Sequence, residues 1–309
     1  MWYYDRPYGG EADLMAMCSL IAELNHGEGS NMDWTVGRVI DWRYGLWNPA
    51  KLDEAWFGRN CRLWYDRVGK LAGFALSEDG RGDYAFFARP EYAFLYGAQI
   101  AWAEGEFGPK LQAGEELTIT VADGDEARRA ALLRAAYADR GHGETTALYA
   151  AGDFRLTADE PLPPGYLVLG MDEFLDQEAQ IDLKNDAFRD GAALDAALAH
   201  AFRYVKRSPI YDPSMDLVLT DGRGLAVAGC EGFMDYENGV VEVERVCTRR
   251  GFRNRGFAGA VIRACVARAL TRGARFAQIS GLNERTIRLY GSFGPHRAIR
   301  RSVFTKSPS

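Results

Sequence analysis

Cysteine and histidine are scarce in this sequence of 309 residues, which has 5 cysteines and 4 histidines. None of them forms a Cys-x-x-Cys pair or a Cys/His pair with the spacing of metal ligands. We therefore expect no bound metal, buried cysteines that act as small hydrophobic residues, and no catalytic histidine. The odd number of scattered cysteines also predicts a reducing, cytoplasmic setting. The residues concerned are Cys18, Cys61, Cys230, Cys247 and Cys265, and His26, His142, His200 and His296.

Long apolar runs and an excess of positive charge are also missing. No run approaches the roughly 18 residues that span a bilayer, and residues 1–7 lack the basic and apolar regions of a signal peptide. The 37 Lys and Arg residues against 43 Asp and Glu residues give a net charge of −6. We therefore expect no membrane partner and no nucleic-acid partner. The length predicts two domains of ordinary size.

One local stretch, residues 246–258, is strongly basic. It reads as the end of a strand, a loop with Arg249, Arg250, Arg253 and Arg255, and the start of a helix at Gly256. The first turn of a helix offers unpaired N–H groups and the positive end of the helix dipole. The arginines would add mobile positive charge. The free amides, the helix dipole and the arginines together predict an anion site. The alternative is an ordinary turn whose arginines are only solvated.

The flanking patterns place this loop inside a regular series of elements. Residues 216–220, 225–235 and 240–248 are predicted strands, and the Asn-Gly pair at 238–239 is a strong hairpin signal. Apolar spacing predicts a helix from 257 to about 273, then a strand at 276–280 and a second short helix. Upstream, residues 166–169 and 172–188 read as a first strand and a first helix. The order around the loop is βββαβα.

At this point the segment from 217 to about 305 resembles the GNAT superfamily of acyl-CoA-dependent N-acetyltransferases. The family's pyrophosphate loop has the form Gln/Arg-x-x-Gly-x-Gly/Ala, which residues 253–258 match. A second family signature is matched by Asn283, Tyr290 and Gly294. The sequence departs from the family at Pro295, where an aromatic residue is usual. We expect this departure to alter the start of the last strand and the acceptor-side wall.

The resemblance implies acetyl-CoA as the acyl donor and a set of residues that bind it. The main chain of strand residues 246–248 would pair with the pantetheine amides, and the loop would bind the diphosphate. Asn283 would hold the pantetheine or, alternatively, only cap the following helix. The implied binding residues are Val246, Cys247, Thr248, Arg253, Asn254, Arg255, Gly256, Phe257, Ala258 and Asn283.

Transfer to an amine requires a proton acceptor and a donor for the leaving thiolate. Glu242 and Glu244 alternate along one strand, so both carboxylates face one side. The resemblance implies that an acidic residue here acts as base, with Glu244 the first choice and Glu242 the second. Either could instead be a solvated residue or a partner of Arg245. The family implies that Tyr290 is the acid, and its alternative is a ring packed on the core.

The first half of the sequence repeats this organisation without its chemistry. Residues 63–75 parallel 217–229, and a βββαβα order follows, with a last helix expected at about 126–139. Where the second copy has its glycine loop, the first has Pro90, which removes an amide, and Glu91, which would repel phosphate. We therefore expect a degenerate copy without a coenzyme A motif that packs on the active domain. A proline-rich run at 159–165 suggests the boundary.

The expected fold is thus α/β (α+β), with two GNAT-like domains that are each a mixed, mostly antiparallel twisted sheet flanked by helices. Residues 1–160 form the degenerate domain and 161–309 the catalytic domain that binds acetyl-CoA. The predicted function is acetyl transfer from acetyl-CoA directly to a primary amine of a small molecule, with self-association left open. The alternative is a non-catalytic acyl-CoA sensor or interaction module. A nucleotide P-loop is excluded because no Gly-Lys-Ser/Thr follows the glycines.

Overall fold

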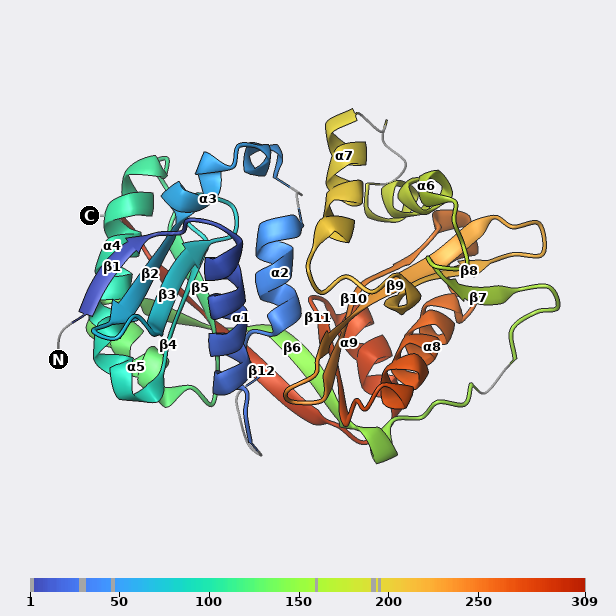
Figure 1. The fold of residues 1–309 in the computed structure, drawn as a ribbon. Helices are drawn as coiled ribbons and strands as arrows, with labels where there is room; N and C mark the ends of the chain where they lie inside the picture. Colours follow the sequence, from blue (N-terminus) through green and yellow to red (C-terminus); the bar gives the residue numbers. More distant parts are fainter. Residues whose placement is uncertain are drawn as a thin grey trace. The chain divides into compact units, whose positions relative to one another are not determined.

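The computed structural model describes residues 3–27, 32–45, 48–158, 161–189, 193 and 196–308. Two compact units make up the chain. Unit 1 comprises Met1–Arg43, Asn48–Thr145 and Ile299–Ser309, and unit 2 comprises Tyr44–Trp47 and Thr146–Ala298. Figure 1 draws most elements of unit 1 in blue to green and most of unit 2 in yellow to red.

Unit 2 contains the series of elements predicted around the basic loop. Its strands are ordered β6-β11-β10-β9-β8-β7, where β6 (Ala138–Ala150) enters from unit 1 at Thr146. Neighbours from β7 to β10 are antiparallel, and β10 and β11 are a parallel pair. The mixed, mostly antiparallel sheet flanked by helices is confirmed. In chain order the elements are β7 (Leu167–Gly170), α6 (Gln177–Phe188), α7 (Ala196–Tyr204), β8 (Asp216–Thr220), β9 (Ala226–Asp235), β10 (Val240–Thr248), α8 (Phe257–Thr271), β11 (Phe276–Gly281) and α9 (Glu284–Tyr290). Strand β12 (Arg297–Lys306) begins at the end of unit 2 and continues in unit 1 from Ile299.

Helices α8 and α6 pack on opposite faces of this sheet. Leu217 and Leu219 of β8 belong to the core that includes the buried side chains of α8. Val218, which lies between them, belongs instead to a cluster with Leu183 of α6. This alternation is the period of two that places successive strand side chains on opposite faces. Helix α6 begins at Gln177 and not at 172, because the Asp176 side chain caps it by accepting from the Ala179 amide.

Strands β10 and β11 pair over only part of their length. The parallel register joins Val240 to Phe276 and continues to Glu242 and Gln278, all within the described residues, and the strands separate beyond that point. On its other side β10 pairs with β9, with a bulge between Glu244 and Cys247. Such a bulge bends the strand locally. The second half of β10 is therefore an edge that faces the start of α8 and α9.

Unit 1 repeats the element order of unit 2. Its first sheet is ordered β1-β2-β3-β4, and β5 pairs with β12. Helix α5 ends at Arg134, earlier than expected, because Ala136 has φ 64°, which a right-handed helix excludes. The elements are β1 (Tyr3–Pro7), α1 (Glu11–Leu24), α2 (Val36–Tyr44), α3 (Ala55–Asn60), β2 (Cys61–Asp66), β3 (Leu71–Ser77), β4 (Tyr84–Ala88), α4 (Tyr96–Phe107), β5 (Leu117–Ala122), α5 (Glu126–Arg134) and β6 (Ala138–Ala150).

In unit 1 the strand that corresponds to β10 is β4. Side chains of the same unit form hydrogen bonds with two of its main-chain carbonyl groups. The Arg128 guanidinium donates to the Phe86 carbonyl oxygen at 3.2 Å. The Gln99 amide donates to the Phe87 carbonyl oxygen at 2.9 Å. Arg128 is 2% exposed and also pairs with Asp33, so it is held in place. These carbonyl groups of β4 are therefore already hydrogen-bonded within unit 1 and are not available to pair with a pantetheine arm.

The division into domains at 160/161 stays a prediction, and the two compact units follow a different division. Residues 159 and 160 lie outside the described residues, but the units divide at Thr145 and Thr146. The reason is that β6 passes from unit 1 into unit 2, and β12 passes from unit 2 into unit 1 at Ile299. The described part of the proline-rich run lies in unit 2 and includes a turn, where the Tyr166 amide donates to the Pro163 carbonyl oxygen at 3.1 Å. Across the described residues, none of the helices combines the length and apolar character of a bilayer span.

Candidate functional site

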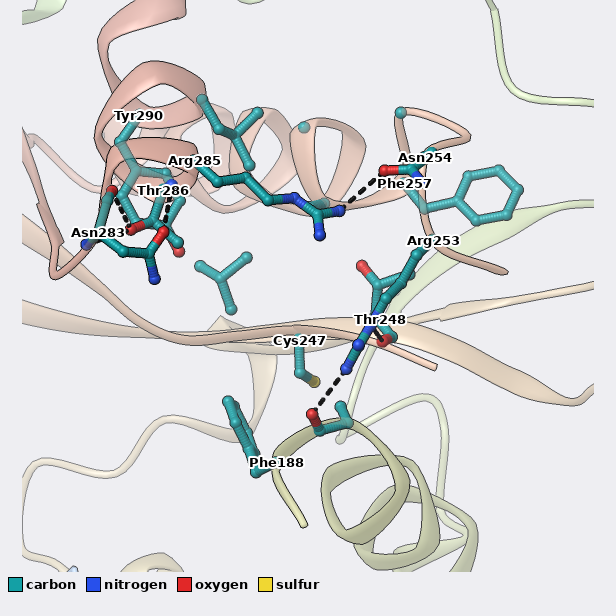
Figure 2. Close-up of a pocket in the computed structure, with 16 residues that line it drawn as sticks. Phe188, Cys247, Thr248, Arg253, Asn254, Phe257, Asn283, Arg285, Thr286 and Tyr290 are labelled. Atoms are coloured by element: carbon teal, nitrogen blue, oxygen red, sulfur yellow. Dashed lines mark hydrogen bonds between the residues drawn. The ribbon is translucent and has the colours of Figure 1, made fainter. Parts of the chain in front are cut away.

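A cavity of about 530 Å³ in unit 2 opens where β10 separates from β11. Figure 2 shows it between the strand below and helices α8 and α9 above. Nine of the ten predicted coenzyme residues line it, and Arg255 is the exception. The lining residues are Ala187, Phe188, Val246, Cys247, Thr248, Arg253, Asn254, Gly256, Phe257, Ala258, Gly259, Asn283, Arg285, Thr286, Leu289 and Tyr290.

The loop before α8 adopts the conformation that an anion site needs. Gly256 caps the helix with φ 76°, a left-handed conformation that favours glycine. A Cβ placed on it would meet no atom within 4 Å, so the space before its main chain is open. The Gly256 carbonyl oxygen accepts from the Ala260 amide at 3.1 Å, which closes the first helical bond. The amides of the preceding helical residues lack a helical acceptor and can bind an anion.

Two of the loop arginines anchor the loop on α6, so the expectation of mobile charge is wrong for them. Arg249 contacts the Asp182 carboxylate at 2.8 Å. Asp186 accepts from the Arg250 main-chain amide at 2.7 Å and from its guanidinium at 3.1 Å. These carboxylates could not be paired with the loop from the sequence, because their helix lies more than sixty residues away.

The other two arginines are also held by the main chain. The Arg253 guanidinium donates to the carbonyl oxygens of Thr248 at 3.3 Å and Ala187 at 2.9 Å, the latter drawn in Figure 2. Arg255 donates to the Gly251 carbonyl oxygen at 3.2 Å and is not among the residues that line the cavity. All four loop arginines therefore have protein partners, and of the four only Arg253 lines the cavity.

Asn283 takes the role of helix cap. Its side-chain oxygen accepts from the Thr286 amide at 3.0 Å, and its own amide donates to the Thr286 hydroxyl at 3.2 Å. This reciprocal capping box fixes the start of α9. Asn283 also lines the cavity, so the cap places it beside the space for a ligand.

Strand residues Val246, Cys247 and Thr248 line the cavity, and the Cys247 thiol is not activated as a nucleophile. Burial, opposed by the charge of Lys184, raises the pKa of the Cys247 thiol to about 12. A thiol with this pKa stays protonated at neutral pH and is a poor nucleophile. All five cysteines are buried and carry free thiols, as expected.

Tyr290 lines the cavity with only 9% of its surface exposed. Burial raises its pKa above the ordinary value of 10.0, and the nearby Glu244 carboxylate raises it further. The phenol is therefore protonated throughout the physiological range and can donate a proton or a hydrogen bond. Its main-chain carbonyl oxygen accepts from the Tyr149 hydroxyl of β6.

The two strand carboxylates differ in their surroundings, and neither lines the described cavity. Glu242 is buried, at 6% exposure, where β10 still pairs with β11. Glu244 is half-buried, lies past the point of separation and is near enough to act on the pKa of Tyr290. The neighbouring Arg245 pairs with Glu231 of β9. Of the two, Glu244 has the more suitable position for proton transfer.

Arg285 was not predicted as a site residue, yet its guanidinium crosses the cavity toward the loop. It donates to the Asn254 side-chain oxygen at 2.8 Å (Figure 2). Phe188, Thr286 and Leu289 also line the cavity without having been predicted. Arg285 could have been suggested by its position two residues after Asn283. Phe188 belongs to the separate helix α6, and no sequence pattern connects it with the loop.

The Acetyltransferase (GNAT) family model matches residues 184–294, which include the whole cavity lining. This range is a GNAT acetyltransferase domain. Proteins of this family are acyl-CoA-dependent acyltransferases that generally use acetyl-CoA. The resemblance inferred from the glycine loop is thereby confirmed. A search of curated protein sequences gave no significant match.

Solved structures share the fold over the full length of the chain. A GCN5-related N-acetyltransferase from Sphaerobacter thermophilus has 18% identity and a TM-score of 0.58, covering 98% of this chain and 95% of its own. A tandem GNAT protein from the clavulanic acid biosynthesis pathway has 13% identity and a TM-score of 0.60, covering 100% and 99%. A GNAT acetyltransferase from Colwellia psychrerythraea has 12% identity and a TM-score of 0.60, covering 98% of both chains. At these identities the likeness establishes the fold alone.

Proposed function

We propose that unit 2 transfers an acetyl group from acetyl-CoA directly to a primary amine of a small molecule. The observation that carries this proposal is that one cavity joins the open amides before α8, the edge of β10 and the phenol of Tyr290. These three features suit the diphosphate, the pantetheine and the thioester of one extended ligand. The family match supports acyl-CoA as the donor.

The bound ligand would extend along the cavity from the glycine loop to Tyr290. The diphosphate would accept from the amides that follow Gly256, where the helix dipole favours negative charge. The pantetheine amides would pair with the main chain of Val246 and Thr248, as an added strand pairs with an exposed sheet edge. The thioester would then lie beside Tyr290, which lines the same cavity.

The chemistry needs no covalent intermediate on the protein. The neutral amine attacks the thioester carbonyl carbon, and Glu244 accepts the proton that the amine loses, directly or through water. The carbon–sulfur bond then breaks, and the departing thiolate takes the phenolic proton of Tyr290. The raised pKa of Tyr290 keeps this proton in place until the thiolate forms. Acetylated amine and free coenzyme A are the products.

The acceptor is proposed to be a small amine because the chain offers little to a polyanion. Its net charge is −6, which disfavours nucleic acid, and the loop arginines are already engaged by α6 and by carbonyl groups. The same composition is consistent with a cytoplasmic protein, which we also propose.

A panel of primary amines, with free thiol release as the readout, tests the proposal. Wild type is compared with Gly256→Trp, whose bulk would block the main-chain approach, and with Gly224→Trp as matched control. Gly224 also has positive φ, 83°, and open space at its Cβ, but lies in a turn between β8 and β9. We expect amine-dependent thiol release by wild type and the control, and none by Gly256→Trp. Coenzyme binding without thiol release for any amine would instead favour a non-catalytic sensor.

A further inference from the structure

A second cavity of about 460 Å³ adjoins the first at the start of α9. Its lining consists of Asn283, Glu284, Arg285 and Arg288, and it shares Asn283 and Arg285 with the first cavity. A ligand whose diphosphate sits at the loop can therefore extend past Arg285 into this second space. None of its lining residues has been given a role by the acetyl-transfer chemistry, apart from Asn283.

Arg285 is fixed in position at the junction of the two cavities. Its guanidinium donates to Asn254 in the loop at 2.8 Å, and its helix begins at the capping box of Asn283 and Thr286. One edge of the guanidinium is used in this contact, so other N–H groups remain for a ligand. Figure 2 shows the side chain extending from α9 toward the loop.

Arg288 lies three residues further along α9, which places it on the same side of the helix as Arg285. It is exposed, and within the described part of the chain its guanidinium has no hydrogen bond or ion pair. Glu284 supplies one negative charge to the same cavity. The lining thus carries two positive charges and one negative charge, which favours an anion.

The anion follows from the chemistry of the proposed donor, and this step rests on the proposed function. Coenzyme A carries a diphosphate and, on the ribose beyond it, a 3′-phosphate. In coenzyme A the ribose lies on the side of the diphosphate away from the pantetheine. With the diphosphate at the α8 amides, it would reach the place where Arg285 contacts Asn254 and borders the second cavity. Guanidinium groups bind phosphate oxygens through paired N–H donors. We propose that Arg285 and Arg288 form the subsite for the 3′-phosphate and so select coenzyme A over its 3′-dephospho form.

Isothermal titration calorimetry of the full chain with coenzyme A and with 3′-dephospho-coenzyme A tests this subsite. For wild type we expect coenzyme A to bind about tenfold more tightly than the dephospho form. Arg288→Ala should reduce this ratio to about threefold or less by weakening coenzyme A while leaving the dephospho form unchanged. Arg223→Ala is the matched control, because Arg223 is an exposed arginine of unit 2 outside both cavities. It should keep the wild-type ratio.

Two further measurements constrain the interpretation. Glu284→Gln removes the opposing charge and should tighten coenzyme A more than the dephospho form. Added salt should lower the wild-type ratio, because exposed charges are screened. Equal affinity of wild type for the two ligands, or a ratio that Arg288→Ala leaves intact, would overturn the subsite alone. Failure of both ligands to bind wild type would overturn the proposed function and this inference with it.

Discussion

The Tyr149 hydroxyl of β6 donates to the main-chain carbonyl oxygen of Tyr290, the proposed proton donor to the leaving thiolate. The same hydroxyl accepts from the Phe293 amide at 3.3 Å. Tyr149 is fully buried, and burial raises its pKa, so its hydroxyl remains a donor. One phenol on β6 therefore satisfies two main-chain groups at the end of α9 and fixes the base of the Tyr290 side chain.

Replacing Tyr149 with Phe should disturb both stability and catalysis. The variant leaves a buried carbonyl oxygen and a buried amide without their partner, which costs about 1–3 kcal/mol of unfolding free energy. Loss of the anchor should lower kcat more than it raises KM, because Tyr290 loses its fixed position. Urea unfolding and steady-state kinetics measure the two effects. Tyr236→Phe is the control, since Tyr236 is 67% exposed. Equal behaviour of the two variants would contradict this role for Tyr149.

Removal of the Tyr290 hydroxyl should affect turnover and spare binding. We expect Tyr290→Phe to lower kcat by about 10²-fold or more, as for loss of a general acid, with the coenzyme dissociation constant changed by less than about twofold. Stopped-flow detection of thiol release and calorimetry measure these quantities. An unchanged kcat would remove Tyr290 from the mechanism.

The pH dependence of kcat gives an independent test of Tyr290. Because its pKa in the folded protein is raised above 10.0, the phenol keeps its proton as the pH rises to that value. Wild-type kcat should therefore show no loss from Tyr290 ionisation up to about pH 10. A falling limb with a midpoint below about pH 9 that disappears in Tyr290→Phe would show that the phenol ionises too early for this role.

Local patterns in the sequence were sufficient to predict the elements around the site. The period of two in residues 240–248 and the helical spacing after Phe257 each depend on neighbouring residues, and β10 and α8 are found there. The glycine loop and the pair Asn283 and Tyr290 were predicted for the same reason, and they line one cavity. The acid-base roles of Glu244 and Tyr290 stay predictions.

Features that depend on distant parts of the chain could not be predicted. The sequence could not predict the ion pairs that Asp182 and Asp186 of α6 form with two of the loop arginines. These pairs depend on how α6 packs against the sheet. The sequence also did not predict that β6 continues from unit 1 into unit 2 and β12 from unit 2 into unit 1. No local feature of β6 indicates the strand with which it pairs. The compact units therefore divide at Thr145, ahead of the proline-rich run.

The anchoring of the loop on α6 predicts an effect on coenzyme binding from outside the cavity. Asp186→Ala removes the acceptor of the Arg250 amide and guanidinium, so the loop should lose its fixed shape. We expect coenzyme affinity to fall about three- to tenfold. Glu178→Ala, which breaks the exposed pair of α6 with Arg203, is the matched control. Calorimetry showing the same affinity for both variants would mean that the loop needs no anchor.

Unit 1 depends on a buried carboxylate between two arginines. Asp33 pairs with Arg128 and with Arg301, the latter at 2.8 Å. Burial acts to raise the pKa of Asp33, but the two guanidinium groups outweigh it and lower the pKa below 3.8. Its contribution to stability is thus present above pH 3.8 and is lost as the pH falls through the lower, folded-state value.

Asp33→Asn should therefore destabilise the protein by about 3–5 kcal/mol at neutral pH, because it leaves buried charges without their partner. The difference between variant and wild type should shrink in strong acid. Denaturant unfolding at several pH values measures both expectations. Asp53→Asn, in an exposed pair with Arg59, is the control and should cause a much smaller change. A pH-independent difference would contradict the linkage.

The central claim is that main-chain amides at the start of α8 bind the diphosphate of an acyl-CoA. A crystal structure of the full chain with coenzyme A tests it most directly. We predict one coenzyme molecule in unit 2, with diphosphate oxygens within hydrogen-bond distance of the amides that follow Gly256 and the thiol beside Tyr290. A coenzyme molecule bound to unit 1 alone, or a diphosphate bound away from these amides, would contradict the account.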